Sequence, residues 1–158
     1  MSGELTHIDE QGRASMVDVS GKPPMRRLAR ARVRFIAAPE TLDRVMDGAL
    51  PKGEALAVAR VAGITAAKQV DRLVPLCHPL ALDHVGVTFQ RTAPDTISIE
   101  TTAQVTAPTG VEMEALTAAS VAALTLWDMT KGVDTGLRID GLELVEKTKR
   151  PLPNAHQQ

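Results

Sequence analysis

Residues 109–132 read TGVEMEALTAASVAALTLWDMTKG, a segment that predicts one long, alanine-rich helix. The helix should begin at about the first glycine of the segment and stop at the last one, a residue type that favours helix C-termini. It opens with two carboxylates, Glu112 and Glu114, and ends with Asp128 and Lys131, and no charge lies between them. Whether these charges serve the helix or a reaction depends on the rest of the chain.

Short runs of alternating apolar and polar residues on both sides of this helix predict strands. The runs are LARARVRF at 28–35, HVGVTFQ at 84–90, TISIETTAQV at 96–105 and LRIDGLELVEK at 137–147. The two middle runs flank a turn at 93–96 and should form a hairpin, and the last run should bend at Gly141. Two further helices are predicted at 39–47, where a proline opens the helix, and at about 53–73.

The resulting order is strand, helix, strand, strand, helix, strand. This order predicts an α+β fold, a ferredoxin-like βαββαβ sandwich with helices on one face of an antiparallel sheet. The domain should cover residues 28–147, between an extended polar N-terminal arm at 1–27 and a flexible tail at 148–158. Because helices cover only one face of such a sheet, a second copy of the chain is expected on the other face.

Composition narrows the classes of function. The chain has only three aromatic residues and a net charge of −1, which argues against a nucleic-acid partner. Its single cysteine, Cys77, excludes an intrachain disulfide and fits a reducing compartment. No run approaches the ~20 apolar residues of a membrane span, and the N-terminus lacks the apolar core of a secretory signal. We therefore expect a cytoplasmic protein without a membrane partner.

The charges on the long helix allow two interpretations. Thr109 and Glu112 have the spacing of a capping box, and the helix dipole favours acids at the start and a lysine at the end. However, Asp128 and Lys131 are three residues apart on one face, a pairing that suits general acid chemistry. Glu114 lies ~21 Å from Asp128 along the axis, so one helix cannot bring both to one small ligand. An antiparallel helix from a second subunit could.

Two other segments are candidates for a site. In LVPLCHPL at 73–80, two prolines hold His78 in a stiff loop, where it either fills the loop or binds phosphate and moves protons. Lys52 precedes a glycine at a predicted helix start and is either solvated or placed to meet an anion. Lys22, with Arg26 and Arg27, lies on the predicted arm and could fold over a polyphosphate. The histidines show no spacing for a metal site.

Four blocks together resemble one family. They are MVDVSGK at 16–22, PKG at 51–53, RVAGITAAKQVDRLVPLCHPL at 60–80 and GVEMEALTAASVAALTLWDMTK at 110–131. These blocks are similar to the accessory protein C family of molybdenum cofactor biosynthesis, the cyclic pyranopterin monophosphate synthases. The resemblance spans about residues 4–147. It implies a phosphorus–oxygen lyase that converts 3′,8-cyclo-7,8-dihydroguanosine 5′-triphosphate to cyclic pyranopterin monophosphate with release of pyrophosphate. It also implies a homohexamer, a trimer of dimers, with active sites at subunit interfaces.

The resemblance further implies the site residues. The catalytic residues it implies are Asp128, Lys131 and Lys52. The substrate-binding residues it implies are Leu76, Cys77, His78, Glu112, Met113, Glu114, Asp18, Lys22 and Lys147. It implies no metal ligand and no cofactor, with assistance by Mg²⁺ left open. The chain departs from the family after Lys147, where KTKRPLP replaces a glycine-rich segment, so Lys149 takes no role. A non-catalytic ligand-binding module and a structural partner of an upstream radical enzyme remain as alternatives.

Overall fold

The computed structural model describes residues 8–153, so the first seven residues of the predicted arm and the last five of the predicted tail lie outside it. Its four strands form one antiparallel sheet in the order β2-β3-β1-β4. The strands are β1 at Met25–Ile36, β2 at His84–Ala93, β3 at Thr96–Ala107 and β4 at Arg138–Arg150. The predicted hairpin is β2-β3.

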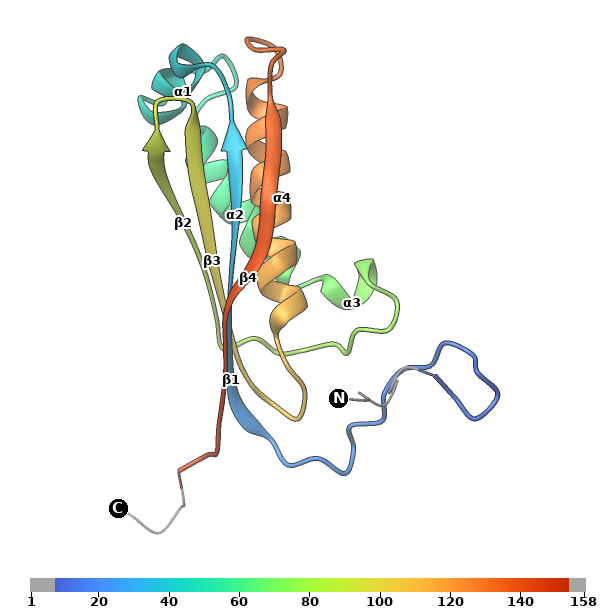
Figure 1. Ribbon diagram of the computed structural model, residues 1–158. Helices are drawn as coiled ribbons and strands as arrows, with labels where there is room; N and C mark the ends of the chain where they lie inside the picture. The colour runs from blue at the N-terminus through green and yellow to red at the C-terminus, as the bar shows by residue number, and fades with distance from the viewer. Residues whose placement is uncertain (1–7, 154–158) are drawn as a thin grey trace.

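The helices lie on one face of this sheet (Figure 1). They are α1 at Pro39–Met46, α2 at Ala55–Ala67, α3 at Val70–Leu73 and α4 at Glu112–Thr130. The long helix α4 packs against β1, β3 and β4, and α2 packs against α4 and β2. The predicted α+β, ferredoxin-like arrangement is therefore confirmed. Among the residues that the structure describes, no helix has the length and apolarity to cross a bilayer.

Small side chains make the core thin. The inward residues of β1 and the inward face of α4 are fully buried, and most of them are alanines. The helices approach so closely that a Cβ atom at Gly63 of α2 would lie 2.9 Å from the Ala118 carbonyl oxygen of α4. The alanine-rich sequence is therefore what lets α2 and α4 lie side by side on a narrow sheet.

Several element boundaries differ from the sequence-based prediction. The helix predicted at 53–73 starts later, because Gly53 has φ = +99°, and breaks after Ala67, so that Val70 turns into the core. The last strand continues to Arg150, three residues beyond its predicted end, because residues 148–150 pair with the start of β1. That start includes Arg26 and Arg27, which were predicted on the arm. The bend at Gly141 is confirmed by its positive φ and the register shift beside it.

The sheet face opposite the helices carries its own ion pairs. Arg30 contacts Glu100 and Glu146 at 2.9 and 3.0 Å, and Arg34 contacts Asp140 at 2.8 Å. The charged side chains of this face pair with one another, so the face does not need to be buried by an apolar surface. The physical reason for expecting a second copy of the chain there is therefore removed. Exposed apolar side chains occur on β4, as Leu142, Leu144 and Val145, and on the helical layer. Those on the helical layer include Val58, Val61 and Leu124.

Candidate functional site

The predicted site residues gather in two clusters, one at each end of α4. The start of α4 lies at the same end of the molecule as α3 and the N-terminal segment, and its last turn lies near the start of α2 (Figure 1). Because α4 is continuous from Glu112 to Thr130, the two clusters are separated by most of its length.

At the C-terminal end of α4, one carboxylate contacts two ammonium groups. Lys131 Nζ lies 2.8 Å from Asp128 Oδ1, and Lys52 Nζ lies 3.1 Å from Asp128 Oδ2. Lys52 also donates to the Asp128 main-chain carbonyl at 2.9 Å, so it satisfies one of the free carbonyls at the helix end. The predicted contact of Asp128 with Lys131 is thus present, and Lys52 joins it from the turn before α2.

The two lysines keep Asp128 ionised. Lys131 and then Lys52 lower the pKa of the Asp128 carboxyl group below its ordinary value through hydrogen bonds and charge. All three side chains are about half exposed. The cluster has a net positive charge, and it can therefore attract an anionic ligand.

At the other end of α4, three segments enclose a pocket. They are the N-terminal segment, the loop after α3 and the residues that start α4. The pocket has a volume of about 310 Å³. Its lining residues are Val17, Val19, Lys22, Leu76, Cys77, His78, Leu80, Thr109, Gly110, Glu112, Met113 and Glu114. Seven of the predicted substrate-binding residues are therefore neighbours in one cavity.

His78 joins the loop to the N-terminal segment. Its Nε2 atom lies 2.7 Å from the Val17 carbonyl oxygen, and it donates there as the N–H tautomer. Next to this contact, the Asp18 carboxylate accepts the Ser20 amide N–H at 2.9 Å. The pKa of Asp18 is lowered by the Ser20 hydroxyl and amide and, to a smaller extent, by His78. Asp18 therefore shapes the segment behind the pocket, although it does not line it.

Glu114 is buried, with 4% of its surface exposed. Burial raises the pKa of its carboxyl group to about 7, and the charges of Glu112 and Asp71 add to the effect. Burial also raises the pKa of the Cys77 thiol, with Glu114 as the second cause. The pocket thus holds a carboxyl group that gains or loses its proton near neutral pH beside a thiol that stays protonated.

Glu112 behaves differently because it has a cationic partner. Burial acts to raise the pKa of Glu112, but the ion pair with Lys147 and the residue's own N–H together lower it below the ordinary value. Lys147 reaches the site from β4 through this ion pair. Arg27 adds positive charge nearby, and its guanidinium donates to the carbonyls of Ala107 and Pro108 at 3.1 and 2.9 Å.

The capping interpretation of Thr109 and Glu112 is wrong. The N-cap residue is Val111, and no side chain caps the helix start. Arg27 was predicted on the arm, and the alternation of β1, extended backwards, would have placed it on that strand instead. The sequence did not single out Gly110 or the apolar lining residues Val17, Val19 and Leu80.

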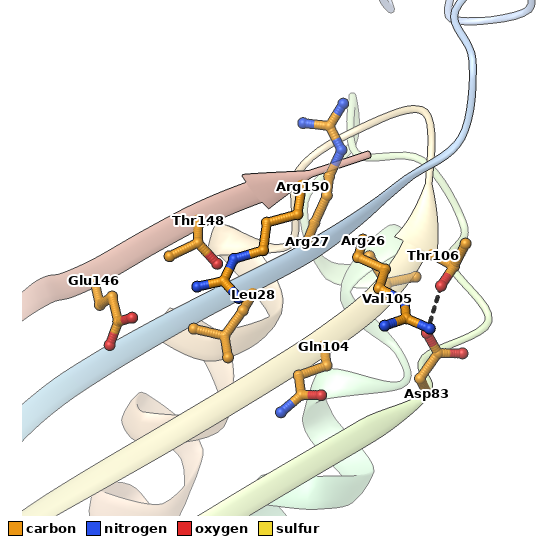
Figure 2. Close-up of a pocket in the computed structure, with 10 residues that line it drawn as sticks. All are labelled: Arg26, Arg27, Leu28, Asp83, Gln104, Val105, Thr106, Glu146, Thr148 and Arg150. Atoms are coloured by element: carbon orange, nitrogen blue, oxygen red, sulfur yellow. Dashed lines mark hydrogen bonds between the residues drawn. The ribbon is translucent and has the colours of Figure 1, made fainter. Parts of the chain in front are cut away.

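A second groove lies on the outer face of the sheet and serves as a comparison. Figure 2 shows Arg26 and Arg150 there beside the carboxylates of Asp83 and Glu146. Its side chains mix both charges. Arg26 and Arg27, two of the candidates for a polyphosphate contact, line it, and among its described lining residues none is a site residue that the resemblance implies. Within residues 8–153, no group of three or more His, Cys, Asp or Glu side chains could hold a metal ion. The absence of a cofactor stays a prediction.

Comparison with known proteins gives a consistent result. The model of the MoaC family matches residues 16–150. A cyclic pyranopterin monophosphate synthase of Desulfitobacterium hafniense is 53% identical over 145 residues, which cover 92% of this chain and 89% of the relative. A cyclic pyranopterin monophosphate synthase of Thermomicrobium roseum is 54% identical over 91% of this chain and 87% of the relative. Cyclic pyranopterin monophosphate synthase 1 of Mycobacterium tuberculosis is also 54% identical, over 91% of this chain and 85% of the relative. The chain belongs to the MoaC family.

Proposed function

We propose that this chain is a cyclic pyranopterin monophosphate synthase of molybdenum cofactor biosynthesis. In this proposal it converts 3′,8-cyclo-7,8-dihydroguanosine 5′-triphosphate to cyclic pyranopterin monophosphate and releases pyrophosphate, as a phosphorus–oxygen lyase in the cytoplasm. Relatives with that name are 53% and 54% identical over more than nine-tenths of the chain. One observation carries the proposal: most of the site residues that the resemblance implies lie either in one polar pocket or in one lysine–aspartate cluster.

The two clusters suit different parts of the reaction. A substrate hydroxyl has to attack phosphorus and lose its proton, while the bond to pyrophosphate breaks and negative charge grows on the leaving group. Lys52 and Lys131 are cationic donors that stabilise such charge, and Asp128 between them can accept a proton. No step of this sum requires an electron carrier.

The pocket suits the other half of the substrate. Glu114, with its pKa of about 7, can either donate a hydrogen bond or accept a proton when the ring system rearranges. His78 and Lys22 bring donors from the loop and the N-terminal segment to the same cavity. The phosphates and the heterocycle of one substrate could therefore contact opposite clusters.

One chain does not bring the clusters together. Glu114 and Asp128 are separated by fourteen residues of α4, or ~21 Å along its axis. The outward face of α4 carries no charge between its charged ends, and Leu124 there is 58% exposed. An antiparallel α4 from a second copy would cover this face and set its Asp128 beside Glu114 of the first. We therefore propose that active sites form between subunits of a homohexamer built from dimers.

The test is direct. Purified protein is mixed with the cyclised dihydro-GTP, and pyrophosphate and the pterin product are followed with and without EDTA. We expect both products in equal amounts and the same rate with EDTA. Binding of the substrate without turnover would contradict the proposal and identify a ligand-binding module. A lack of both binding and turnover would leave a structural role as the remaining function.

A further inference from the structure

Gly110 lies directly under the Glu112 side chain. The carboxyl group of Glu112 folds back toward the residue two positions before it, so that a Cβ atom at residue 110 would lie 2.8 Å from both Cδ and Oε1 and closer still to Oε2. Non-bonded carbon atoms have their optimal separation at about 3.5–4.0 Å, well beyond these distances. The three nearest atoms to such a Cβ all belong to this one carboxyl group, so a side chain at 110 would displace Glu112 first.

The carboxylate is held against Gly110 from the other side. Lys147 of β4 forms an ion pair with it, and the amide N–H of Glu112 also donates to it. The chain just before Gly110 is fixed as well, because Arg27 donates to the carbonyls of Ala107 and Pro108. The segment is therefore fixed by Arg27 and the carboxylate by Lys147, and the missing side chain of Gly110 leaves the space between them.

We propose that Gly110 is a positioning residue for the reaction: its lack of a side chain lets the Glu112 carboxylate lie against the pocket wall, paired with Lys147. This inference rests on the proposed function. Gly110 does not need a backbone conformation reserved for glycine, since its φ is not positive. Gly110 is therefore needed because the absence of a side chain leaves space for the Glu112 carboxylate. A displaced carboxylate would have to swing into solvent or into the pocket, toward the buried Glu114.

The test uses a pair of glycine substitutions. Gly110→Ala should lower kcat/KM about tenfold or more, because a misplaced site group has effects of this order. Gly132→Ala is the matched control, since a Cβ atom there would meet no atom within 4 Å. It should leave kcat/KM unchanged. Combining Gly110→Ala with Glu112→Asp, whose side chain is one methylene shorter, should restore part of the loss. A Gly110→Ala enzyme with the wild-type rate would overturn the inference.

A second readout does not depend on turnover. The carboxyl carbon of Glu112 is followed by NMR through a pH titration and assigned by comparison with Glu112→Gln. In wild type its pKa should lie below the ordinary value, and Gly110→Ala should raise it as the contact with Lys147 is lost. An unchanged titration in Gly110→Ala would show that the carboxylate has not moved, and would overturn the inference. If wild type had no activity, the proposed function would fail, while this titration would still decide the role of Gly110.

Discussion

Glu114 carries its carboxyl group into the protein interior at the first turn of α4. Removal from water disfavours the charged form, and two other carboxylates nearby disfavour it further, so its pKa is raised to about 7. A buried acid with such a pKa costs stability whenever it is ionised. Natural sequences keep groups of this kind mainly where a reaction uses them. The free-energy cost can be measured without any substrate.

Replacing Glu114 with Gln should make the protein less sensitive to pH. In wild type the folded state binds the proton more tightly than the unfolded state, whose pKa is near 4.5. The contribution of Glu114 to stability is therefore greatest below pH ~4.5 and is lost as pH rises to about 7, by on the order of 3 kcal/mol. Glu114→Gln resembles the protonated form at every pH and should lack this loss. Urea unfolding at several pH values measures the free energy of unfolding of both proteins, and Glu10→Gln, at an exposed position, is the control. Parallel pH profiles of Glu114→Gln and wild type would contradict the prediction.

Lys52 contacts both the carboxylate and the main-chain carbonyl of Asp128, and His78 contacts the Val17 carbonyl. Replacing either residue with Ala should lower turnover roughly 10²-fold or more if its group acts in the transition state. The matched controls are Lys68→Ala and His84→Ala, which remove an exposed lysine and an exposed histidine away from the two clusters. Steady-state rates of pyrophosphate release measure the effect. Wild-type rates from Lys52→Ala or His78→Ala would mean that the residue only fills a loop or is solvated.

At the scale of elements, the contact between α2 and α4 sets the position of Lys52 relative to Asp128. Gly63 makes this contact close, because a Cβ atom there would lie 2.9 Å from a backbone oxygen of α4 and 3.2 Å from Val87. Gly63→Ala should therefore push the helices apart and lower the free energy of unfolding by about 1–3 kcal/mol, even though alanine favours helices. Thr65→Ala, on the exposed face of α2, is the control. Urea unfolding decides, and a more stable Gly63→Ala protein would contradict the close packing.

Much of this element level could be predicted from sequence, since alternation in β1 and β3 marks the buried side of a strand directly. Patterns that depend on distant partners were harder. The last three residues of β4 are polar and become a strand only because residues 26–28 pair with them. The break in the helix after Ala67 follows from the burial of Val70, which local propensity does not show. The role of Gly110 depends on where a carboxylate two residues away folds back, and its sequence neighbours do not reveal that.

At the scale of the whole molecule, the two faces differ in what they can bind. The outer sheet face has internal ion pairs, whereas the helical face exposes Val58, Val61 and Leu124. Exposed apolar side chains gathered on one face are typical of a subunit contact. Leu124→Lys should therefore dissociate the assembly to a chain of 16.9 kDa, while Gln90→Lys on the outer sheet face should not. Sedimentation at micromolar concentration distinguishes them. A wild-type protein that is already monomeric would remove the basis for a shared site.

The shared site makes a stricter prediction about two inactive variants. Glu114→Gln damages the pocket, and Lys131→Ala damages the lysine–aspartate cluster, so each homo-oligomer should have no intact site. If each site combines the pocket of one subunit with the cluster of another, mixing the two variants and letting subunits exchange should create sites in which both residues are native. Part of the activity should then return, in proportion to the mixed dimers that native mass spectrometry detects. Mixed oligomers that stay inactive would mean that each chain builds its own site. The ~21 Å between the two ends of α4 would then have to be spanned within one chain, by a substrate-induced bend in a helix that is continuous here.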